Sequence, residues 1–454
     1  MSSPTPAATS VAVYSPALKS AISKAAKRLM PMLVILYFVA FLDRTNVGFA
    51  EEALRVDRGV SDGAFALGAG IFFIGYAIFE IPSNLMLRRF GAKVWLARIA
   101  ITWGIVAAAF AFTTNDVMFV VLRFLLGVTE AGLFPGIIMF LAEWFPNKVR
   151  VQMFAIFYLA QPLSQMIGSP LSGGLISFGD AVTPWEGWQV MFFTEGLLAI
   201  AAGIVAIFLL INHPQQAKFL DDDEKSALAE VMKTEDALRT EDGPSGIWRA
   251  MASWKVWYFT IIYFCLEIAV YGTTFYLPQQ VSGLIGQSVG WQVGLLSAIP
   301  WFVGLFACYF AGRAANTILR RRNWGTWFYI ITGLAIFGSA WAGAAGAPFL
   351  GILFITIAVA SFLSVGPITW AYPTAFLTGA AAAAGIGLIN SLGNLGGFVA
   401  PLMRTGFNNA MPTESGVWGV VSLGVFAFLA AAMLYCTRFF SSKSDELLDV
   451  SPGH

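Results

Sequence analysis

The sequence predicts an all-α membrane protein with twelve transmembrane helices in two six-helix halves, and three observations support this fold class. First, 57% of the 454 residues are hydrophobic and 12% are charged, against about 45–50% and about 25% in soluble domains. Second, the mean hydropathy is +0.72. Third, a polar stretch in the middle of the chain separates two sets of long apolar runs.

The first half of the chain contains six apolar runs, each long enough to cross a bilayer, because a membrane helix needs about 20 mainly apolar residues. We expect these spans near residues 29–50, 64–87, 94–114, 117–143, 151–178 and 188–211. Residues 1–28 carry four basic side chains without an apolar core of their own. They are therefore expected to form a tail and not a cleaved signal peptide.

The second half contains six more runs, near residues 254–281, 290–317, 324–343, 348–371, 379–403 and 416–438. The predicted domains are thus residues 29–211 and 253–438, joined by a charged linker at 212–252 and followed by a tail at 439–454. Spans five and eleven are both rich in small residues, which allow close helix packing. Two six-helix halves with a weak internal repeat are typical of secondary transporters.

The distribution of basic residues predicts the orientation in the membrane. If both chain ends lie in the cytoplasm, 22 of the 27 Lys and Arg fall on the inner side. Only Arg55, Arg58 and Arg404 then lie outside, and two further arginines lie within spans. We therefore expect both termini to be cytoplasmic.

The composition also excludes several classes of protein. A net charge of +1 gives no support for nucleic-acid binding. The 3 cysteines fall inside apolar runs, and there are only 2 histidines, so neither a disulfide framework nor a metal site is indicated. We expect no enzyme activity, no metal and no cofactor.

Four charged residues inside spans one and four form the main candidate site: Asp43, Arg44, Arg123 and Glu130. A charge at the centre of a bilayer costs about 2.5–3.5 kcal/mol on insertion scales, so such residues usually serve a function. Arg123 and Glu130 are seven residues apart and share one helix face, but this spacing is too long for a direct bond. Asp43 and Arg44 point about 100° apart, so one can face a cavity while the other packs against a neighbouring helix.

The charge of this cluster indicates the class of ligand. The four charges sum to zero, and the site becomes doubly positive if both carboxylates take up protons. Such a site suits an anion, and arginine can bind a carboxylate in a bidentate geometry. The alternative is a structural role, in which two ion pairs hold spans one and four together.

Three further acids lie inside or near the ends of spans. Glu80 is interpreted as a gate residue or a helix-end partner of Arg89, and Glu195 as structural. Glu267 is the only acid inside the second-half spans. It either lines the cavity or has a structural role.

Two pairs of amides have i, i+4 spacing, which places both members on one face of a helix. Gln161 and Gln165 lie in span five, and Asn390 and Asn394 lie in the glycine-rich span eleven. Such pairs often join helices through hydrogen bonds. Because the helices are interrupted by glycine or proline, we favour cavity lining for Gln161 and Asn390.

Several stretches carry a family resemblance: FLDRTNVGFA at 41–50, FIGYAIFEIPSN at 73–84, LRFLLGVTEAG at 122–132 and GSPLSG at 168–173. They resemble the anion:cation symporter branch of the major facilitator superfamily, in its bacterial organic-acid group. The resemblance covers nearly the whole first half, whereas the second half matches mainly in hydropathy and glycine placement.

The resemblance implies the major facilitator fold and proton-driven uptake of a small organic carboxylate by alternating access. It also implies a bacterial inner membrane location, contact with membrane lipid, and function as a monomer. A proton on Glu130 is expected to weaken its hold on Arg123 and free that guanidinium for the substrate. The residue roles that it implies are proton binding for Asp43 and Glu130, substrate carboxylate binding for Arg44 and Arg123, and substrate contact for Tyr76, Gln161 and Asn390.

The sequence leaves more than one substrate class and more than one direction of transport open. Aromatic residues in span seven favour an aromatic carboxylate, with a hydroxy acid or sugar acid as the second choice. A proton-coupled antiporter that exports organic cations or drugs is the main alternative, although two arginines beside two acids argue against a cationic ligand. A receptor or a membrane-embedded enzyme is a further alternative, but no nucleophile–base set or metal cluster is visible in the sequence.

Overall fold

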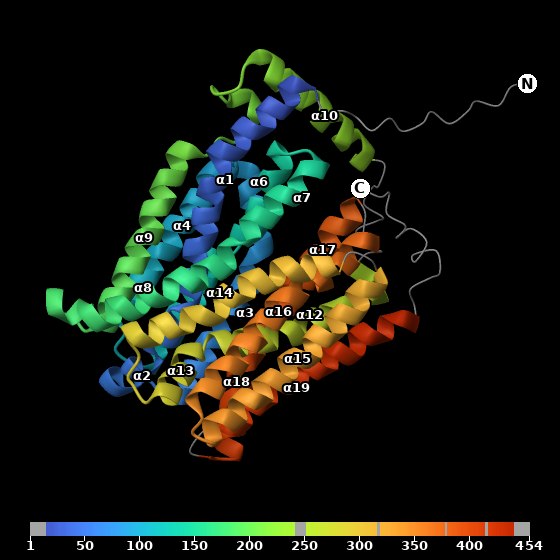
Figure 1. The fold of residues 1–454 in the computed structure, drawn as a ribbon. Coiled ribbons are helices and arrows are strands. Elements are labelled where there is room, and N and C mark those ends of the chain that lie inside the picture. Colours follow the sequence, from blue (N-terminus) through green and yellow to red (C-terminus); the bar gives the residue numbers. More distant parts are fainter. Residues whose placement is uncertain (1–14, 241–250, 316–317, 377–378, 414–415, 440–454) are drawn as a thin grey trace, which may run out of the picture.

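The computed structural model describes residues 15–240, 251–315, 318–376, 379–413 and 416–439, and in these residues the regular structure is helical (Figure 1). The fold class predicted from the sequence is confirmed. The helices of the first half are α1 (Pro16–Thr45), α2 (Val47–Arg58), α3 (Asp62–Phe90), α4 (Ala92–Ala109), α5 (Asp116–Glu130), α6 (Leu133–Trp144), α7 (Asn147–Tyr158), α8 (Ala160–Val182) and α9 (Gly187–Leu209).

The linker contains α10 (Asp222–Thr240), and the second half follows it. Its helices are α12 (Trp254–Thr274), α13 (Leu277–Ile285), α14 (Trp291–Ala314), α15 (Ile318–Ala344), α16 (Pro348–Phe376), α17 (Gly379–Gly393), α18 (Gly396–Ala410) and α19 (Val417–Cys436). Short 3-10 turns occur at Phe110–Phe112, Pro214–Gln216 and Thr437–Phe439.

Within the described residues, 11 helices are long and apolar enough to cross a membrane. They correspond to the predicted spans except the fifth, near 151–178, which is formed by α7 and α8. The helix is present there, since α8 alone has 23 residues. Its sequence is rich in Ser, Gly and Gln, and these residues lower its hydropathy below that of the other spans.

Within the described residues, five spans are interrupted part-way along their length. Span one breaks at Asn46, span four at 131–132, span five at Leu159, span seven at 275–276 and span eleven at 394–395. Broken helices are tolerated at membrane depth only where protein or a cavity surrounds the freed backbone groups. In transporters such breaks mark the level of the substrate site.

The break in span four depends on a glycine. Gly132 has φ +88°, a left-handed conformation that other residues adopt only with strain. A Cβ atom at this position would also lie 2.3 Å from the Ser83 hydroxyl oxygen. The turn therefore ends α5 at Glu130 and holds this carboxylate at the end of a helix.

The outer surface of the bundle is apolar. Large hydrophobic side chains point outward along the helices, and Phe208 and Phe349 are 76% and 89% exposed. Extended apolar surface on a protein marks contact with a membrane or a partner. Buried apolar clusters fill the interior, one mainly in the first half and another in the second.

The two halves contact each other along α3 with α18 and along α8 with α14. Their backbones approach closely at Gly48, where a Cβ atom would lie 2.1 Å from the Phe275 carbonyl oxygen. We call the end of the bundle with α2 and α13 the α2 end, and the end with α10 and the start of α1 the α10 end (Figure 1).

Candidate functional site

The four predicted charges are buried at the level of the helix breaks. Asp43, Arg44, Arg123 and Glu130 are 2%, 8%, 1% and 0% exposed. Asp43 and Arg44 lie in the last turn of α1, and the other two lie in α5. Because buried charges need partners or a ligand, the contacts of each side chain decide what the site can do.

Arg44 connects three helices and both halves of the protein. Its guanidinium forms an ion pair with the Glu130 carboxylate, from α1 to α5. It also donates a hydrogen bond of 3.1 Å to the Tyr271 hydroxyl of α12, in the second half. The guanidinium lies 4.8, 4.9 and 5.5 Å from three ring centroids, those of Phe41, Phe72 and Tyr76. Aromatic faces stabilise a cation at such distances.

Arg123 has a different environment. Its Nε donates to the Gly68 carbonyl at 3.1 Å, and one terminal nitrogen donates to the Ala69 carbonyl at 3.3 Å. Among the described residues, no carboxylate oxygen lies within 4.0 Å of this guanidinium. The carbonyl groups orient Arg123, but they do not neutralise its charge.

The expected pairing of Glu130 with Arg123 is not observed, because the ion-pair partner of Glu130 is Arg44. The physical reason is the spacing within α5. Seven residues of an α-helix rise about 10 Å, and two side chains on one face do not bridge that distance. Arg44 reaches Glu130 from the neighbouring helix instead.

Asp43 faces away from this ion pair. Its Oδ2 accepts a hydrogen bond of 2.8 Å from the Trp103 indole nitrogen of α4, and its Oδ1 has no hydrogen-bond partner. Asp43 therefore packs within the first half while Arg44 faces the second half. This matches the expected divergence of neighbouring side chains on a helix.

Glu130 keeps one oxygen available. Oε1 accepts from Arg44, whereas Oε2 is buried without a hydrogen-bond partner. A buried polar atom without a partner is costly and calls for a functional explanation. A carboxylate with one paired and one unpaired oxygen can take up a proton on the unpaired oxygen.

The other predicted site residues of the first half have different surroundings. Tyr76 is buried beside Arg44. Gln165 donates to the Thr45 hydroxyl at 2.8 Å, a bond that joins α8 to α1 within the first half. Gln161 lies in the first turn of α8 and is half-buried.

In the second half, Glu267 is 7% exposed and lies one turn before Tyr271 in α12. Asn390 is 8% exposed near the end of α17, and Asn394 lies at the break before α18. The structure thus places the predicted second-half residues near the helix breaks. Within the described residues, the side-chain hydrogen bonds of the four charges go to other partners and not to Glu267, Asn390 or Asn394.

Glu80 reaches the opposite half. Its Oε2 accepts a 3.0 Å hydrogen bond from the Ser391 hydroxyl of α17. This contact between the halves is consistent with a gate. The alternative was a pair with Arg89, but the guanidinium of Arg89 lies over the Phe90 ring. Glu80 therefore contributes to the contact between α3 and α17.

Sequence reasoning missed two partners of the four charges and the environment of a further acid. Trp103 and Tyr271 were not expected to bond Asp43 and Arg44, although buried Trp and Tyr usually find a polar partner. Glu195 also has a more specific environment than expected. Its two oxygens accept 2.7 Å bonds from Asn46 and Ser172.

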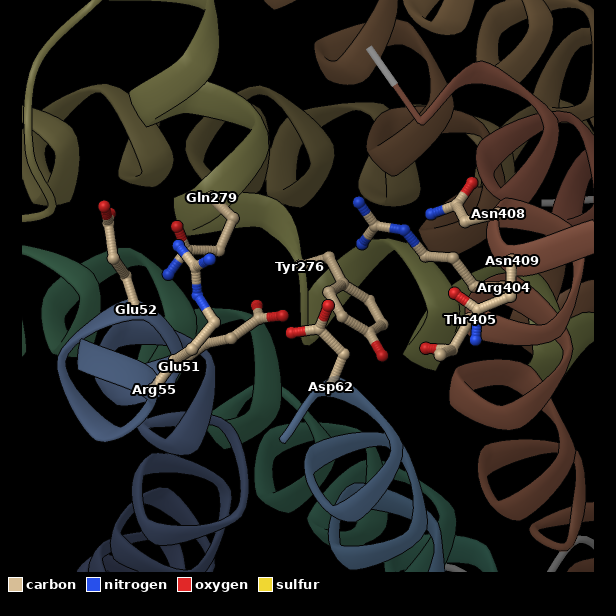
Figure 2. A pocket seen from close by; sticks show the side chains of 10 residues that line it. All are labelled: Glu51, Glu52, Arg55, Asp62, Tyr276, Gln279, Arg404, Thr405, Asn408 and Asn409. Carbon is tan, nitrogen blue, oxygen red and sulfur yellow. The ribbon is translucent and has the colours of Figure 1, made fainter. Parts of the chain in front are cut away.

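A cavity of about 220 Å³ lies between the halves at the α2 end (Figure 2). The first half contributes three acids, and the second half contributes Arg404, whose guanidinium carbon lies 3.7 Å from the Tyr276 ring centroid. None of the four buried charges lines this cavity. Its lining residues are Glu51, Glu52, Arg55, Asp62, Tyr276, Gln279, Arg404, Thr405, Asn408 and Asn409.

Comparison with protein families and named proteins gives consistent results. The model of the Major Facilitator Superfamily matches residues 33–401. The inner membrane transport protein RhmT of Escherichia coli is 36% identical over 93% of this chain and 96% of its own length. A protein of Agrobacterium vitis named as a tartrate transporter is 41% identical over 83% of this chain and 85% of its own.

Another relative is named for a different activity. The quinolone resistance transporter of Acinetobacter baumannii is 36% identical over 82% of this chain and 85% of its own. Among solved structures, the xylose transporter XylE from E. coli, in a partially occluded inward open conformation, matches with a TM-score of 0.71. It is 14% identical over 94% of this chain and 99% of that chain, so the likeness concerns the fold alone.

Proposed function

Because this chain belongs to the Major Facilitator Superfamily and its relatives are membrane transporters and not enzymes, we propose that it imports a small organic anion together with protons. The membrane is that of a bacterial cell, with the α10 end in the cytoplasm. The distribution of Lys and Arg supports this orientation.

The observation that carries the proposal is the unequal pairing of the two buried arginines. Arg44 has a carboxylate partner, whereas Arg123 is held by two backbone carbonyls and has no carboxylate within 4.0 Å among the described residues. A buried guanidinium that is oriented but not neutralised suits a substrate carboxylate, which it can bind through two parallel hydrogen bonds.

The proton acts through Glu130. While Glu130 is ionised, it holds Arg44 and the pair is neutral. A proton from the outside, taken up on the unpaired Oε2, removes the charge that attracts Arg44. Arg44 and Arg123 then offer two positive charges to one carboxylate, and Asp43 provides a second proton-binding position. Release of the proton to the cytoplasm restores the Arg44–Glu130 pair and displaces the anion.

The second half takes part through Tyr271. Its hydroxyl bonds the same guanidinium that Glu130 holds, so a change in the position of Arg44 alters a contact between the halves. Alternating access needs such a contact, because the bound state must differ from the empty state at the interface between the moving parts. This link supports the view that proton and substrate binding control which end of the bundle opens.

The ring environment bears on the substrate. The Phe72 ring centroid lies within 5.4 Å of the guanidinium carbons of both Arg44 and Arg123. The Phe275 ring centroid lies 5.9 Å from the guanidinium carbon of Arg123. Rings beside a carboxylate-binding arginine favour an aromatic carboxylate. The relative named as a tartrate transporter favours a hydroxy acid, so aromatic acids are the first choice and hydroxy acids or sugar acids the second.

A second candidate function is proton-coupled export of an organic cation or drug. The relative named as a quinolone resistance transporter favours it. The charge of the site argues against it, because the four charges sum to zero even when both acids are ionised. The site then has no net negative charge to offset the cost of burying a cation in a medium of low dielectric.

The test is proton entry into proteoliposomes that contain an internal pH dye. Phthalate, hydroxyphenylacetate, tartrate and a sugar acid are added in turn, with protein-free liposomes as the control. Acidification of the interior with one class of acid supports symport and identifies that class. If no acid has an effect and organic cations instead cause proton exit, the protein is an exporter and the proposal is wrong.

A further inference from the structure

A second group of buried polar side chains lies on the other side of α1 from the Arg44–Glu130 pair. Glu195 of α9, Asn46 and Ser172 of α8 are 1%, 2% and 1% exposed. The Asn46 amide nitrogen donates to one Glu195 oxygen at 2.7 Å, and the Ser172 hydroxyl donates to the other at 2.7 Å. The carboxylate thus joins α9, α8 and the end of α1.

This group contains no cation. Among the described residues, neither Glu195 nor Asp43 has a Lys, Arg or His nitrogen within 4.0 Å. Two buried acids without a counter-charge are a costly arrangement for helix packing alone. Acids of this kind within membrane spans are characteristic of proton pathways.

The charged groups on the elements packed against Glu195 have other partners. On α1, Asp43 accepts from Trp103, and Arg44 pairs with Glu130 on the opposite side. On α2, Asp57 accepts from Trp188 at 3.0 Å. On α4, Arg98 lies 3.9 Å from the Trp95 ring centroid. Of these, Asp43 is the titratable group that shares the buried side of α1 with Asn46.

Asn46 can respond to a proton on Glu195. An asparagine side chain has a donor end and an acceptor end. Its donor now faces Glu195, and its Oδ1 is buried without a partner. Once Glu195 is protonated, its hydroxyl needs an acceptor, and a rotated Asn46 amide supplies one.

The position of Asn46 gives this response a consequence. Asn46 is the residue between α1 and α2, and Gly48, two residues later, packs closely against the Phe275 backbone of the second half. Further along α2, Glu51 and Glu52 enter the cavity at the α2 end (Figure 2). A change at Asn46 therefore acts on the segment that closes this end.

We propose that Glu195 is a third proton-binding carboxylate and that it acts as a positioning residue, setting the α1–α2 junction through Asn46 and thereby controlling closure of the α2 end. The ionised form holds the junction in the arrangement that the structure shows. The protonated form releases it. This inference deepens the proposed function and rests on it for its place in transport, but the closure itself can be tested without any substrate.

The first measurement is the alkylation rate of a cysteine in the cavity. Thr405→Cys is introduced after Cys265, Cys308 and Cys436 are replaced by Ala, and labelling is followed from pH 5 to pH 8. Because alkylation needs the thiolate, each rate is divided by that of a free thiol at the same pH. We expect this ratio to depend on pH in the protein with wild-type Glu195, and Glu195→Gln to abolish the dependence. A double change, Asn46→Asp with Glu195→Gln, returns a carboxylate to the same contact and is expected to restore it.

Ser172→Ala is the matched variant that keeps the carboxylate and removes one donor to it. Loss of a donor disfavours the ionised form, so the midpoint of the pH dependence is expected to move to higher pH. A purely structural role would lower the melting temperature and leave the midpoint in place. If Glu195→Gln folds and its labelling keeps the wild-type pH dependence, the proposal is wrong. If Glu195→Gln does not fold, the midpoint measured in Ser172→Ala decides between the two roles.

The same variants are then tested for uptake with the pH dye. If the wild-type protein shows pH-dependent labelling but no proton-linked anion uptake, the proposed function fails and the role of Glu195 in closure stands. If uptake occurs and labelling does not depend on Glu195, the role of Glu195 fails and the proposed function stands.

Discussion

Helix α1 forms ion pairs in two different regions of the protein. At the α10 end, the Lys24 ammonium lies 2.6 Å from the Glu224 carboxylate of α10, and these side chains are 44% and 3% exposed. Part-way through the bundle, Arg44 pairs with Glu130, and these side chains are 10% and 0% exposed. The same helix thus has one pair at the surface, where the lysine meets water, and one in the protein interior.

The difference teaches what each pair can do. Water reaches the Lys24 ammonium and screens the surface pair, so this pair contributes little to stability and little changes when it is broken. Loss of one partner from a buried pair costs about 3–5 kcal/mol, because the other charge stays in the interior unpaired. The Arg44–Glu130 pair is therefore able to drive a change of state, whereas the Lys24–Glu224 pair holds the linker against α1.

The largest expected effect is that of Glu130→Gln. Glutamine cannot take up or release a proton, so Arg44 stays available to the substrate in every state. We expect proton-driven accumulation of the anion to be lost while exchange of labelled for unlabelled anion continues. Uptake against a gradient and counterflow in proteoliposomes measure the two activities.

Glu143→Gln is the control for that change. Glu143 lies at the α10 end of α6 with one oxygen 2.8 Å from His213, and both side chains are about half exposed. Accumulation by this variant is expected to equal that of the wild-type protein. Accumulation above the outside concentration by Glu130→Gln would contradict the assigned role of Glu130.

The next effect is that of Arg123→Lys. Lysine keeps the charge but lacks the planar guanidinium. That group can donate to the Gly68 and Ala69 carbonyls and still have N–H groups left for the substrate. A hydrogen bond to a charged group contributes about 1.5–3 kcal/mol, so we expect substrate affinity to fall about 10- to 150-fold. Arg98→Lys, at an arginine over the Trp95 ring, serves as the control, and equal affinities in all three proteins would refute the role of Arg123.

A smaller effect is expected for Tyr271→Phe, which removes the hydrogen bond between the halves and keeps the ring. A typical hydrogen bond contributes about 0.5–1.5 kcal/mol net, so we expect a 2- to about 10-fold lower uptake rate with an unchanged ratio of protons to anion. Tyr329→Phe is the matched control, because the Tyr329 hydroxyl bonds Thr369 at 2.9 Å within the second half. A changed proton ratio in Tyr271→Phe would assign this tyrosine to proton transfer instead.

The sequence predicted the spans, the two halves and the four buried charges, because charged residues inside apolar runs are conspicuous. It did not predict which charges pair. Spacing within α5 excluded a direct Arg123–Glu130 bond, but the partner of Glu130 comes from α1, and only the packing of α1 against the rest of the first half reveals it. The break at Gly132 and the bond from Asn46 to Glu195 depend on contacts distant in sequence, which no local pattern specifies.

The smallest effect is expected at the surface pair of Lys24 and Glu224, and the pH dependence of this effect has a defined sign. Hydrogen bonds from Lys24 and Ser20 lower the pKa of Glu224 from 4.5 to about 2. The ionised form is thus favoured in the folded protein, and this contribution to stability is complete above about pH 4.5 and is lost as the pH falls toward 2. Glu224→Gln should therefore lower the melting temperature in detergent by only about 2 °C at pH 7, and the difference from wild type should narrow below pH 4.5. A difference that widens in acid would show that Glu224 is not the group that stabilises the contact between α1 and α10, whereas a large loss of uptake at pH 7 would show that this end of α1 does more than hold the linker.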